Sequence, residues 1–137
     1  MKKTMLLSAF LMLGMAFMVQ AQDEVIERPA DVKNPKIDTW KNASFDLYDR
    51  IREIKANADS DDSYSPAEDL SSLTEEVILL FGKTAIMGKE ALNGPKLKIL
   101  KYQKSVRMST KALKWCKDYV GSVVGADAVE GEEGDGK

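Results

Sequence analysis

Apolar and small residues recur at intervals of three and four along three stretches of the chain, and this spacing is the strongest constraint on its fold. The three series are Ile37, Trp40, Ser44, Leu47, Ile51, Ile54 and Ala58; Leu70, Leu73, Val77, Leu80, Thr84, Met87 and Ala91; and Ile99, Tyr102, Val106, Ser109, Leu113, Cys116, Val120 and Val123. Such spacing places each series on one side of a helix with 3.6 residues per turn. No stretch alternates with a period of two for long enough to form a strand. The sequence therefore predicts an all-α fold.

Turn-forming and capping residues mark the ends of the predicted helices. The predicted helices span approximately 38–57, 66–92 and 96–123. The first helix begins either at Asp38 or a turn earlier, where Asn34 precedes Pro35. Asparagine and aspartate side chains both accept hydrogen bonds from the first amides of a helix, and proline is favoured at the first helical position. The sequence leaves these two starting points open.

The second helix has a start signal and a stop signal of its own. Ser65, Pro66 and Glu68 match a capping box, in which the serine and the glutamate side chains each bind a backbone amide at the helix start. Asn93 and Gly94 can take left-handed backbone angles and so end the helix. The second helix is therefore expected to run without interruption between these two signals.

These elements predict a small three-helix up-down-up bundle, because short connections make neighbouring helices antiparallel. The expected parts are a signal peptide at 1–21, an extended lead-in at 22–36, the bundle at 37–124 and a disordered acidic tail at 125–137. The expected buried residues are Trp40, Leu47, Ile51, Val77, Leu80, Phe81, Val106, Leu113 and Cys116. Gly82 and Gly88 are interpreted as small residues that allow helices to approach closely. A homodimer is an alternative, since the second helix is apolar over more than one face.

The N-terminal residues predict export. Lys2 and Lys3 precede an apolar run that ends at Val19, and Val19 and Ala21 place small side chains at the two positions that a signal peptidase recognises. This segment resembles a bacterial secretory signal, which implies cleavage after Ala21 and a periplasmic or secreted protein. The alternative is an uncleaved anchor, although the run is shorter than the roughly 20 residues that a membrane span needs.

The composition excludes several kinds of chemistry. The chain has no histidine and one cysteine, Cys116. The absence of histidine excludes a Ser-His-Asp triad, a Cys-His dyad, a histidine-ligated haem and the usual zinc sites. One cysteine forms no internal disulfide, and Cys116 lies on an apolar helix stripe as a small core residue does. We therefore expect no enzyme activity and no cofactor.

The polar stretch between the first two helices raises the question of a calcium site. The oxygen-bearing residues at the spacing of EF-hand ligands are Asn57, Asp59, Asp61, Ser65 and Glu68. Asp62, however, stands where an EF-hand has a glycine for its sharp turn, and no second hand follows in the chain. The capping box also needs the same Ser65 and Glu68 side chains. A solvated turn that leads into a capped helix is therefore favoured over a metal site.

The third helix carries the strongest charge asymmetry in the chain. Its basic ridge, at intervals of three and four, consists of Lys101, Lys104, Arg107, Lys111, Lys114 and Lys117. The stretch 59–76, by contrast, holds seven acidic residues and no basic one. Either these acids neutralise the ridge within the bundle, or acids and bases simply coexist on a solvated surface, or the ridge faces an anionic surface. Because lysine is a point charge without the fork of arginine, a diffuse surface is expected rather than the recognition of nucleic-acid bases.

The sequence thus supports hypotheses from different classes but names no ligand. The first is an exported, non-enzymatic helical module of the bacterial cell envelope that binds a protein partner or has a structural role. The second is a binder of anionic surfaces, such as lipid, lipopolysaccharide or an acidic protein, through the basic ridge. The third is a calcium-responsive module that uses residues 57–68. No specific nucleic-acid partner is expected.

Overall fold

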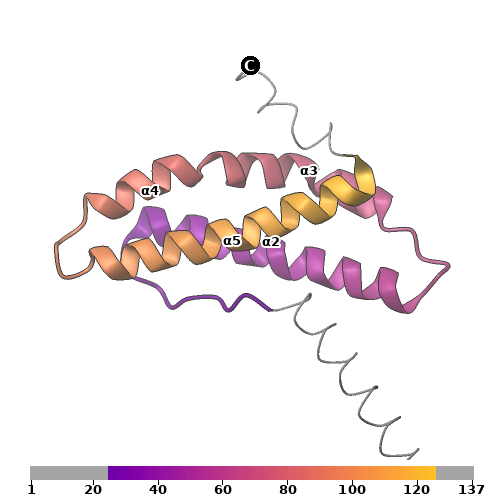
Figure 1. Cartoon of the computed structure of the whole chain (residues 1–137), viewed down its shortest axis with the longest axis horizontal. Coiled ribbons are helices and arrows are strands. Elements are labelled where there is room, and N and C mark those ends of the chain that lie inside the picture. The colour runs from indigo at the N-terminus through magenta and orange to yellow at the C-terminus, as the bar shows by residue number, and fades with distance from the viewer. Residues whose placement is uncertain (1–24, 126–137) are drawn as a thin grey trace, which may run out of the picture.

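The structure is a computed structural model and describes residues 25–125, so the expected signal peptide and nearly all of the expected acidic tail lie outside the described residues (Figure 1). The helices are α2 (Pro35–Ser60), α3 (Ala67–Gly82), α4 (Thr84–Leu92) and α5 (Ile99–Val124). All regular secondary structure within the described range is helical, which confirms the all-α class. Together α3 and α4 occupy the place of the second predicted helix.

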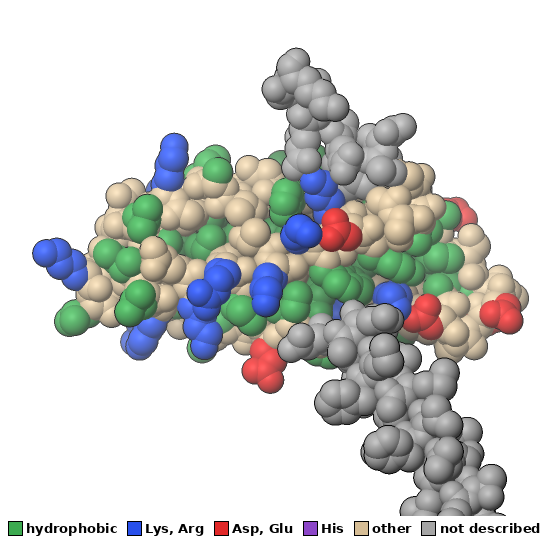
Figure 2. Space-filling model, in the orientation of Figure 1, with side chains coloured by type: hydrophobic (Ala, Val, Ile, Leu, Met, Phe, Trp, Pro, Cys, Tyr) green, Lys and Arg blue, Asp and Glu red, His purple; other side chains and the backbone are tan. Residues whose placement is uncertain are grey.

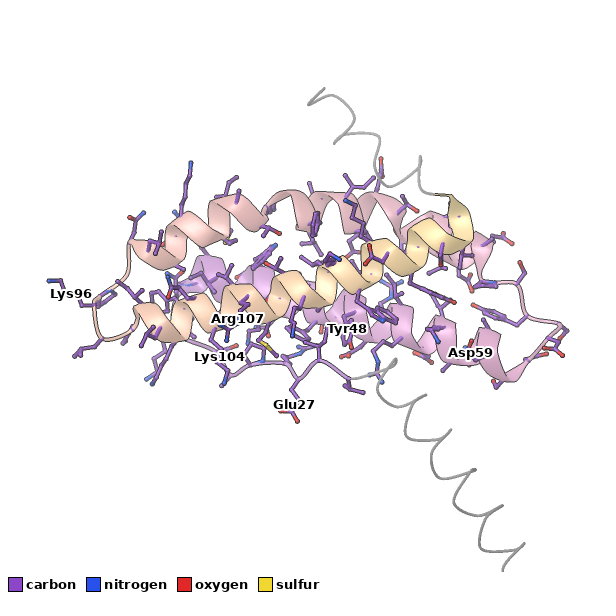
Figure 3. The ribbon with its side chains drawn as sticks, in the orientation of Figure 1. Glu27, Tyr48, Asp59, Lys96, Lys104 and Arg107 are labelled. Carbon is purple, nitrogen blue, oxygen red and sulfur yellow. The ribbon has the colours of Figure 1, made fainter. Side chains whose placement is uncertain are left out.

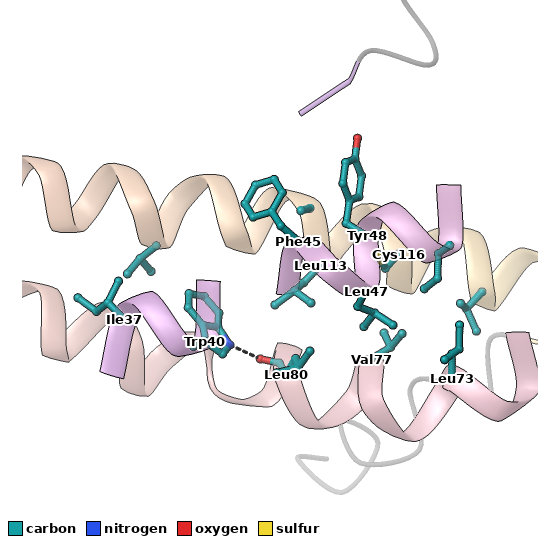
Figure 4. Close-up of a cluster of buried hydrophobic side chains, with 14 of the residues drawn as sticks. Ile37, Trp40, Phe45, Leu47, Tyr48, Leu73, Val77, Leu80, Leu113 and Cys116 are labelled. Carbon is teal, nitrogen blue, oxygen red and sulfur yellow. Dashed lines mark hydrogen bonds between the residues drawn. The ribbon is translucent and has the colours of Figure 1, made fainter. Parts of the chain in front are cut away.

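One hydrophobic core lies between α5 and the other helices, because α5 packs against α2, α3 and α4. Figure 4 shows side chains from α2, α3 and α5 meeting in this core. The expected core residues found buried are Trp40, Leu47, Ile51, Val77, Leu80, Val106, Leu113 and Cys116. Phe81 is only partly buried, at the edge of the core. The apolar periodicity therefore selected the packing face of each helix correctly.

The first helix takes the earlier of its two possible starts. The Asn34 side chain accepts hydrogen bonds from the amides of Lys36 at 3.1 Å and Ile37 at 3.2 Å, and Pro35 is the first helical residue. Asp38 does not cap the helix. Its carboxylate instead accepts a hydrogen bond from the backbone amide of Val32 at 2.8 Å, which holds the preceding segment against the helix.

The expectation of an uninterrupted second helix is wrong, because the helix is interrupted at Lys83, between α3 and α4. The carbonyl oxygen of Leu80 accepts a hydrogen bond from the indole nitrogen of Trp40 at 2.8 Å (Figure 4). The amide of Lys83 also donates to this carbonyl at 3.2 Å. A side chain that bonds to a helix carbonyl is a recognised cause of kinks, and Gly82 lowers the local helix propensity further.

The connection between α4 and α5 also differs from the prediction. Neither Asn93 nor Gly94 has a positive φ angle, so the expected left-handed cap is wrong. Gly94 is needed for space instead, because a Cβ atom there would lie 2.3 Å from Cε2 of Tyr102. The amides of Lys98 and Ile99 both donate to the carbonyl of Pro95 in this connection, and α5 begins after the turn.

Gly82 and Gly88 do not serve a close approach of helices, contrary to expectation. Apart from the neighbouring backbone of its own helix, a Cβ atom at either position would meet nothing within 4 Å. Both positions are open, so the glycines lower helix propensity there without a packing reason.

The part of the lead-in that the structure describes, residues 25–34, has no regular secondary structure and is docked on α2. The backbone amide of Ile26 donates to the hydroxyl of Tyr48 at 3.0 Å, and Arg28 pairs with Asp46 at 2.8 Å. The buried ammonium of Lys41 donates to a backbone carbonyl of the segment at 2.9 Å. These contacts attach the lead-in along the helix.

Candidate anion-binding surface

The basic ridge lies on the face of α5 opposite the core. The core face of α5 consists of Tyr102, Ser105, Val106, Ser109, Ala112, Leu113, Cys116 and Val120, all of them buried. The ridge residues on the outer face are Lys101, Lys104, Arg107, Lys111, Lys114 and Lys117, of which the first five are exposed. Steps of three and four separate the two faces because a helix has 3.6 residues per turn.

The ridge divides into an open part and an engaged part. Lys101, Lys104, Arg107 and Lys111 form no ion pair with any acidic residue in the described range. Farther along α5, Lys114 pairs with Asp118 at 3.4 Å. The open part of the ridge is therefore the section between positions 101 and 111.

The last ridge residue is engaged with the neighbouring helix. The ammonium of Lys117 lies over the ring of Phe81, 4.8 Å from its centroid, and its side chain is half-buried. A cation at this distance is attracted to the electron-rich face of the ring. Lys117 therefore belongs to the packing between α5 and α3 more than to the exposed surface.

Basic and acidic side chains are unevenly distributed over one face of the molecule (Figure 2). Figure 3 shows Lys96 at the end where α4 connects to α5, whereas Asp59 lies toward the opposite end. On the face shown in Figure 2, most basic side chains lie toward the first end, and the acidic ones lie at the middle and toward the second. Asp59 pairs locally with Lys55 at 2.7 Å rather than with the open ridge. The ridge residues Lys104 and Arg107 thus lie nearer the basic end, away from this acid (Figure 3).

The calcium candidates are not brought together as a ligand cluster. Asn57 and Asp59 are in the last turns of α2, while Asp61 lies just beyond it. The Asp61 carboxylate accepts hydrogen bonds from the hydroxyl of Ser63 at 2.6 Å and from its amide at 3.0 Å, and these bonds lower the pKa of Asp61. Within residues 25–125, no group of three or more histidine, cysteine, aspartate or glutamate side chains is placed to hold a metal ion.

The remaining calcium candidates, Ser65 and Glu68, do not form the expected capping box either. Pro66 already has helical angles, with φ −78° and ψ −14°, and no side chain caps the first amides of α3. The first backbone bond of the helix runs from the amide of Leu70 to the carbonyl of Pro66 at 2.9 Å. Because the helical conformation already includes Pro66, Ser65 is not at the position from which a serine side chain caps a helix.

A different side-chain contact closes this turn. The hydroxyl of Tyr64 donates to the Asp69 carboxylate in the first turn of α3. This hydrogen bond raises the pKa of Tyr64 to about 12. The polar groups of the turn are thus used in local structure.

Cys116 is a core residue, as its position on the apolar stripe predicts. Its side chain is fully buried, and burial raises the pKa of the thiol. A thiol reacts through its thiolate form, which burial disfavours. Cys116 therefore provides no nucleophile at the surface.

An apolar group at the basic end of the molecule was not predicted from the sequence. Leu92, Leu97 and Leu100 expose 58%, 95% and 78% of their surface. None of them is in the periodic series that predicts the core. A detectable signal was present, since Leu97 lies between Lys96 and Lys98 in a turn, where no packing partner is expected.

A shallow groove was also missed, since it depends on the break between α3 and α4. It has a volume of about 420 Å³ and lies beside Trp40. Its other lining residues are Pro35, Lys36, Thr39, Ala43, Leu80, Lys83 and Met87. The groove is mainly apolar, with the two lysines as its only charged groups.

Comparison of the chain with protein-family models, curated proteins and solved structures finds no match. No helix in the part of the chain that the structure describes is both long and apolar enough to cross a membrane.

Proposed function

We propose that this chain is an exported, non-enzymatic helical module of the bacterial cell envelope that binds phosphate-bearing anionic surfaces through the open part of the α5 ridge. Export is inferred from the N-terminal signal, with cleavage after Ala21. The absence of histidine supports a non-enzymatic role, because most acid–base and nucleophilic sites depend on that residue. The module has no cofactor in this proposal.

The proposed architecture is an up-down-up three-helix bundle followed by a disordered acidic tail at 125–137. The short connections and the packing of α5 against the other helices support the bundle. The glycine-rich, acidic composition supports the tail, since such a segment buries too little apolar surface to offset the entropy of ordering.

The observation that carries the proposal is the group of exposed cations on α5 that have no acidic partner in the described range. After the proposed cleavage the chain would hold 18 basic and 22 acidic side chains, a net charge of −4. Salt screens charges beyond about 8 Å at physiological ionic strength, so a nearby surface responds to the local ridge more than to the net charge. Because these cations form no ion pair in the described range, their positive charge is available to a nearby surface.

The kind of charge on the ridge favours a diffuse surface. Three of the four open positions are lysine, and a lysine ammonium attracts phosphate without a fixed geometry. Each lysine or arginine near an anionic lipid surface contributes on the order of 1 kcal/mol to binding. Four such groups on one helix are enough for reversible adsorption.

The test is a charge-reversal variant on the ridge. The purified protein starts at Gln22, the product of the proposed cleavage, and retains every described helix. Lys104→Glu/Lys111→Glu is expected to weaken binding to phosphatidylglycerol-containing vesicles at least about thirtyfold, from the loss of two cations alone. Helical content should stay unchanged, because both side chains are exposed.

A matched control separates the ridge from net charge. Arg50→Glu/Lys83→Glu makes the same change in net charge at exposed positions off α5 and should retain most of the binding. Equal losses in the two variants would show that the ridge has no special role. No binding by the unaltered protein at low ionic strength would refute the proposal and leave a protein partner as the alternative.

A further inference from the structure

The connection between α4 and α5 presents leucine side chains to solvent at one end of the molecule. Leu97 is 95% exposed and Leu100 is 78% exposed, while Leu92 at the end of α4 is 58% exposed. An isolated exposed leucine is ordinary, but three within nine positions around one turn form an apolar tip. We define the tip as Leu92, Leu97 and Leu100.

The turn holds the tip in a fixed shape. The amides of Lys98 and Ile99 donate to the carbonyl of Pro95 at 2.8 and 3.1 Å. Gly94 lies directly against the ring of the buried Tyr102, which leaves no room for a side chain. Leu97 is therefore exposed on an ordered turn, with Leu92 and Leu100 on the helix ends beside it, and the three need little rearrangement to contact a partner.

Cations surround the tip. The exposed lysines next to the leucines are Lys89, Lys96, Lys98 and Lys101, and none pairs with an acid in the described range. Figure 2 shows basic and hydrophobic side chains together at this end of the molecule. The nearest acid in the sequence, Glu90, is turned to α2, where it lies 3.7 Å from the Lys36 ammonium and accepts a hydrogen bond from Asn34.

The start of α5 adds to this positive charge. No side chain caps its first amides, and its first turn holds no acidic residue. No negative side chain therefore offsets the positive end of the helix dipole, which lies at the tip. Exposed apolar side chains within a ring of cations match the boundary layer of an anionic bilayer, where acyl chains and phosphates lie within a few ångströms of each other.

We propose that the tip inserts Leu97 and Leu100 into the interfacial layer of an anionic phospholipid bilayer, with Leu92 at its margin and the surrounding lysines on the lipid phosphates. This inference rests on the proposed function, since the ridge brings the same end of α5 to the surface. A soluble polyanion would explain the lysines but not the leucines, and a protruding tip suits penetration of a bilayer. The acidic turn near Asp59 would then lie away from the lipid (Figure 3).

The first experiment compares two pairs of exposed apolar residues in the protein that starts at Gln22. Leu97→Ser/Leu100→Ser is expected to weaken binding to phosphatidylglycerol-containing vesicles at least about tenfold. The free energy gained by moving two leucine side chains from water into the lipid is larger than the free energy that corresponds to a tenfold change in affinity. Binding to soluble polyphosphate should not change. The control Leu79→Ser/Ile86→Ser, at positions 61% and 63% exposed, should keep the vesicle affinity of the unaltered protein.

The second experiment places an environment-sensitive fluorophore on Leu97→Cys or on Leu79→Cys. Cys116 is buried, so the label reacts at the introduced cysteine. The probe at position 97 should shift to a shorter emission wavelength on anionic vesicles, and the probe at position 79 should not.

The outcomes distinguish this inference from the proposed function. If Leu97→Ser/Leu100→Ser binds vesicles normally and the probe at position 97 stays in water, insertion is refuted while adsorption through the ridge stands. If the unaltered protein binds neither vesicles nor polyphosphate at low ionic strength, the proposed function fails as well. Equal losses in the tip and control pairs would also overturn the inference, because any exposed apolar residue would then suffice.

Discussion

Trp40 shapes the fold through a single polar atom. Its side chain is 3% exposed, and its indole nitrogen donates to the Leu80 carbonyl from a helix that is 40 positions away in the sequence. In a continuous helix this carbonyl would accept from the amide four residues later, at Thr84. Here the amide of Lys83 bonds to it instead, and the helix ends at Gly82. One side-chain hydrogen bond thus accompanies the division of the predicted second helix into two.

The Trp40→Phe variant tests this contact. Phenylalanine keeps much of the buried apolar surface but has no donor for the Leu80 carbonyl, so the free energy of unfolding should fall by about 1–2 kcal/mol. Trp115→Phe makes the same replacement at a half-buried position whose indole nitrogen bonds to no described residue, and its effect should be smaller. Urea denaturation measures both. A Trp40→Phe loss no larger than that of Trp115→Phe would mean that the hydrogen bond is not significant.

Two glycines should respond oppositely to alanine. Gly88 is inside α4 with no atom within 4 Å of the added Cβ, so Gly88→Ala should raise the free energy of unfolding by up to about 1 kcal/mol through helix propensity. Gly94→Ala places its Cβ 2.3 Å from the buried Tyr102 ring and should lower stability by roughly 1–3 kcal/mol. Thermal denaturation measures both variants. If both substitutions raised the stability, or both lowered it, the result would contradict this account.

At the scale of the elements, the segment before α2 is the part whose role differs most from its sequence signal. Its composition suggests only an extended lead-in, whereas the structure attaches it to α2 through side chains that lie far away in the sequence. Lys41 is the main anchor. Its side chain is 2% exposed, and its ammonium donates to the Pro29 carbonyl and to the Asp31 carboxylate. No local pattern predicts such a contact, because a lysine on a helix is ordinarily solvated.

Truncation of this anchor should release the segment. Lys41→Ala removes two hydrogen bonds and a buried aliphatic stem, so we expect a loss of about 1–3 kcal/mol in the free energy of unfolding. Lys36→Ala, which removes a 75% exposed lysine from a 3.7 Å ion pair, should cost at most about 1 kcal/mol. Hydrogen exchange at the amides of Ile26 and Val32 should accelerate only in Lys41→Ala. Unchanged exchange there would contradict the role of Lys41 as an anchor.

The same anchor should make stability depend on pH in acid. The hydrogen bond from Lys41 lowers the pKa of Asp31 below its ordinary value of 3.8. A lowered carboxyl pKa contributes stability that is present above the ordinary pKa and is lost as the pH falls through the lowered value. The difference in stability between the unaltered protein and Lys41→Ala should therefore shrink below pH 3.8. Urea denaturation at each pH measures this difference in the free energy of unfolding. If the difference stayed constant or grew in acid, Asp31 would not be the source of the pH dependence.

At the scale of the whole molecule, the apolar periodicity predicts those features that are determined within a single helix. The three apolar series identified the helical class and the buried face of each helix, whereas Phe81, which was expected to be buried although it lies outside these series, is only partly buried. The break at Lys83 was not predictable, since it depends on a tryptophan from another helix. The capping box at Ser65 and Glu68 failed because the backbone of Pro66 is already helical.

The candidate site shows the same limit. The spacing of the basic residues placed the ridge on the outer face of α5, where Lys104 and Arg107 are indeed exposed. The sequence left open whether acids from other parts of the chain neutralise them, because pairing depends on the fold. The leucines at the tip were overlooked for a similar reason. A leucine outside the periodic series is informative only when the fold shows that nothing covers it.

The most direct test of the central claim, that local positive charge on α5 brings an acidic protein to an anionic surface, is sedimentation of the protein that starts at Gln22 with lipid vesicles across a range of ionic strength. We predict that it binds phosphatidylglycerol-containing vesicles at low ionic strength and that binding falls steeply as salt rises, because salt screens the lysines and the lipid phosphates from one another. Vesicles of phosphatidylcholine alone should bind much less. Failure to bind the anionic vesicles at low ionic strength, or equal binding to both lipids, would contradict the account.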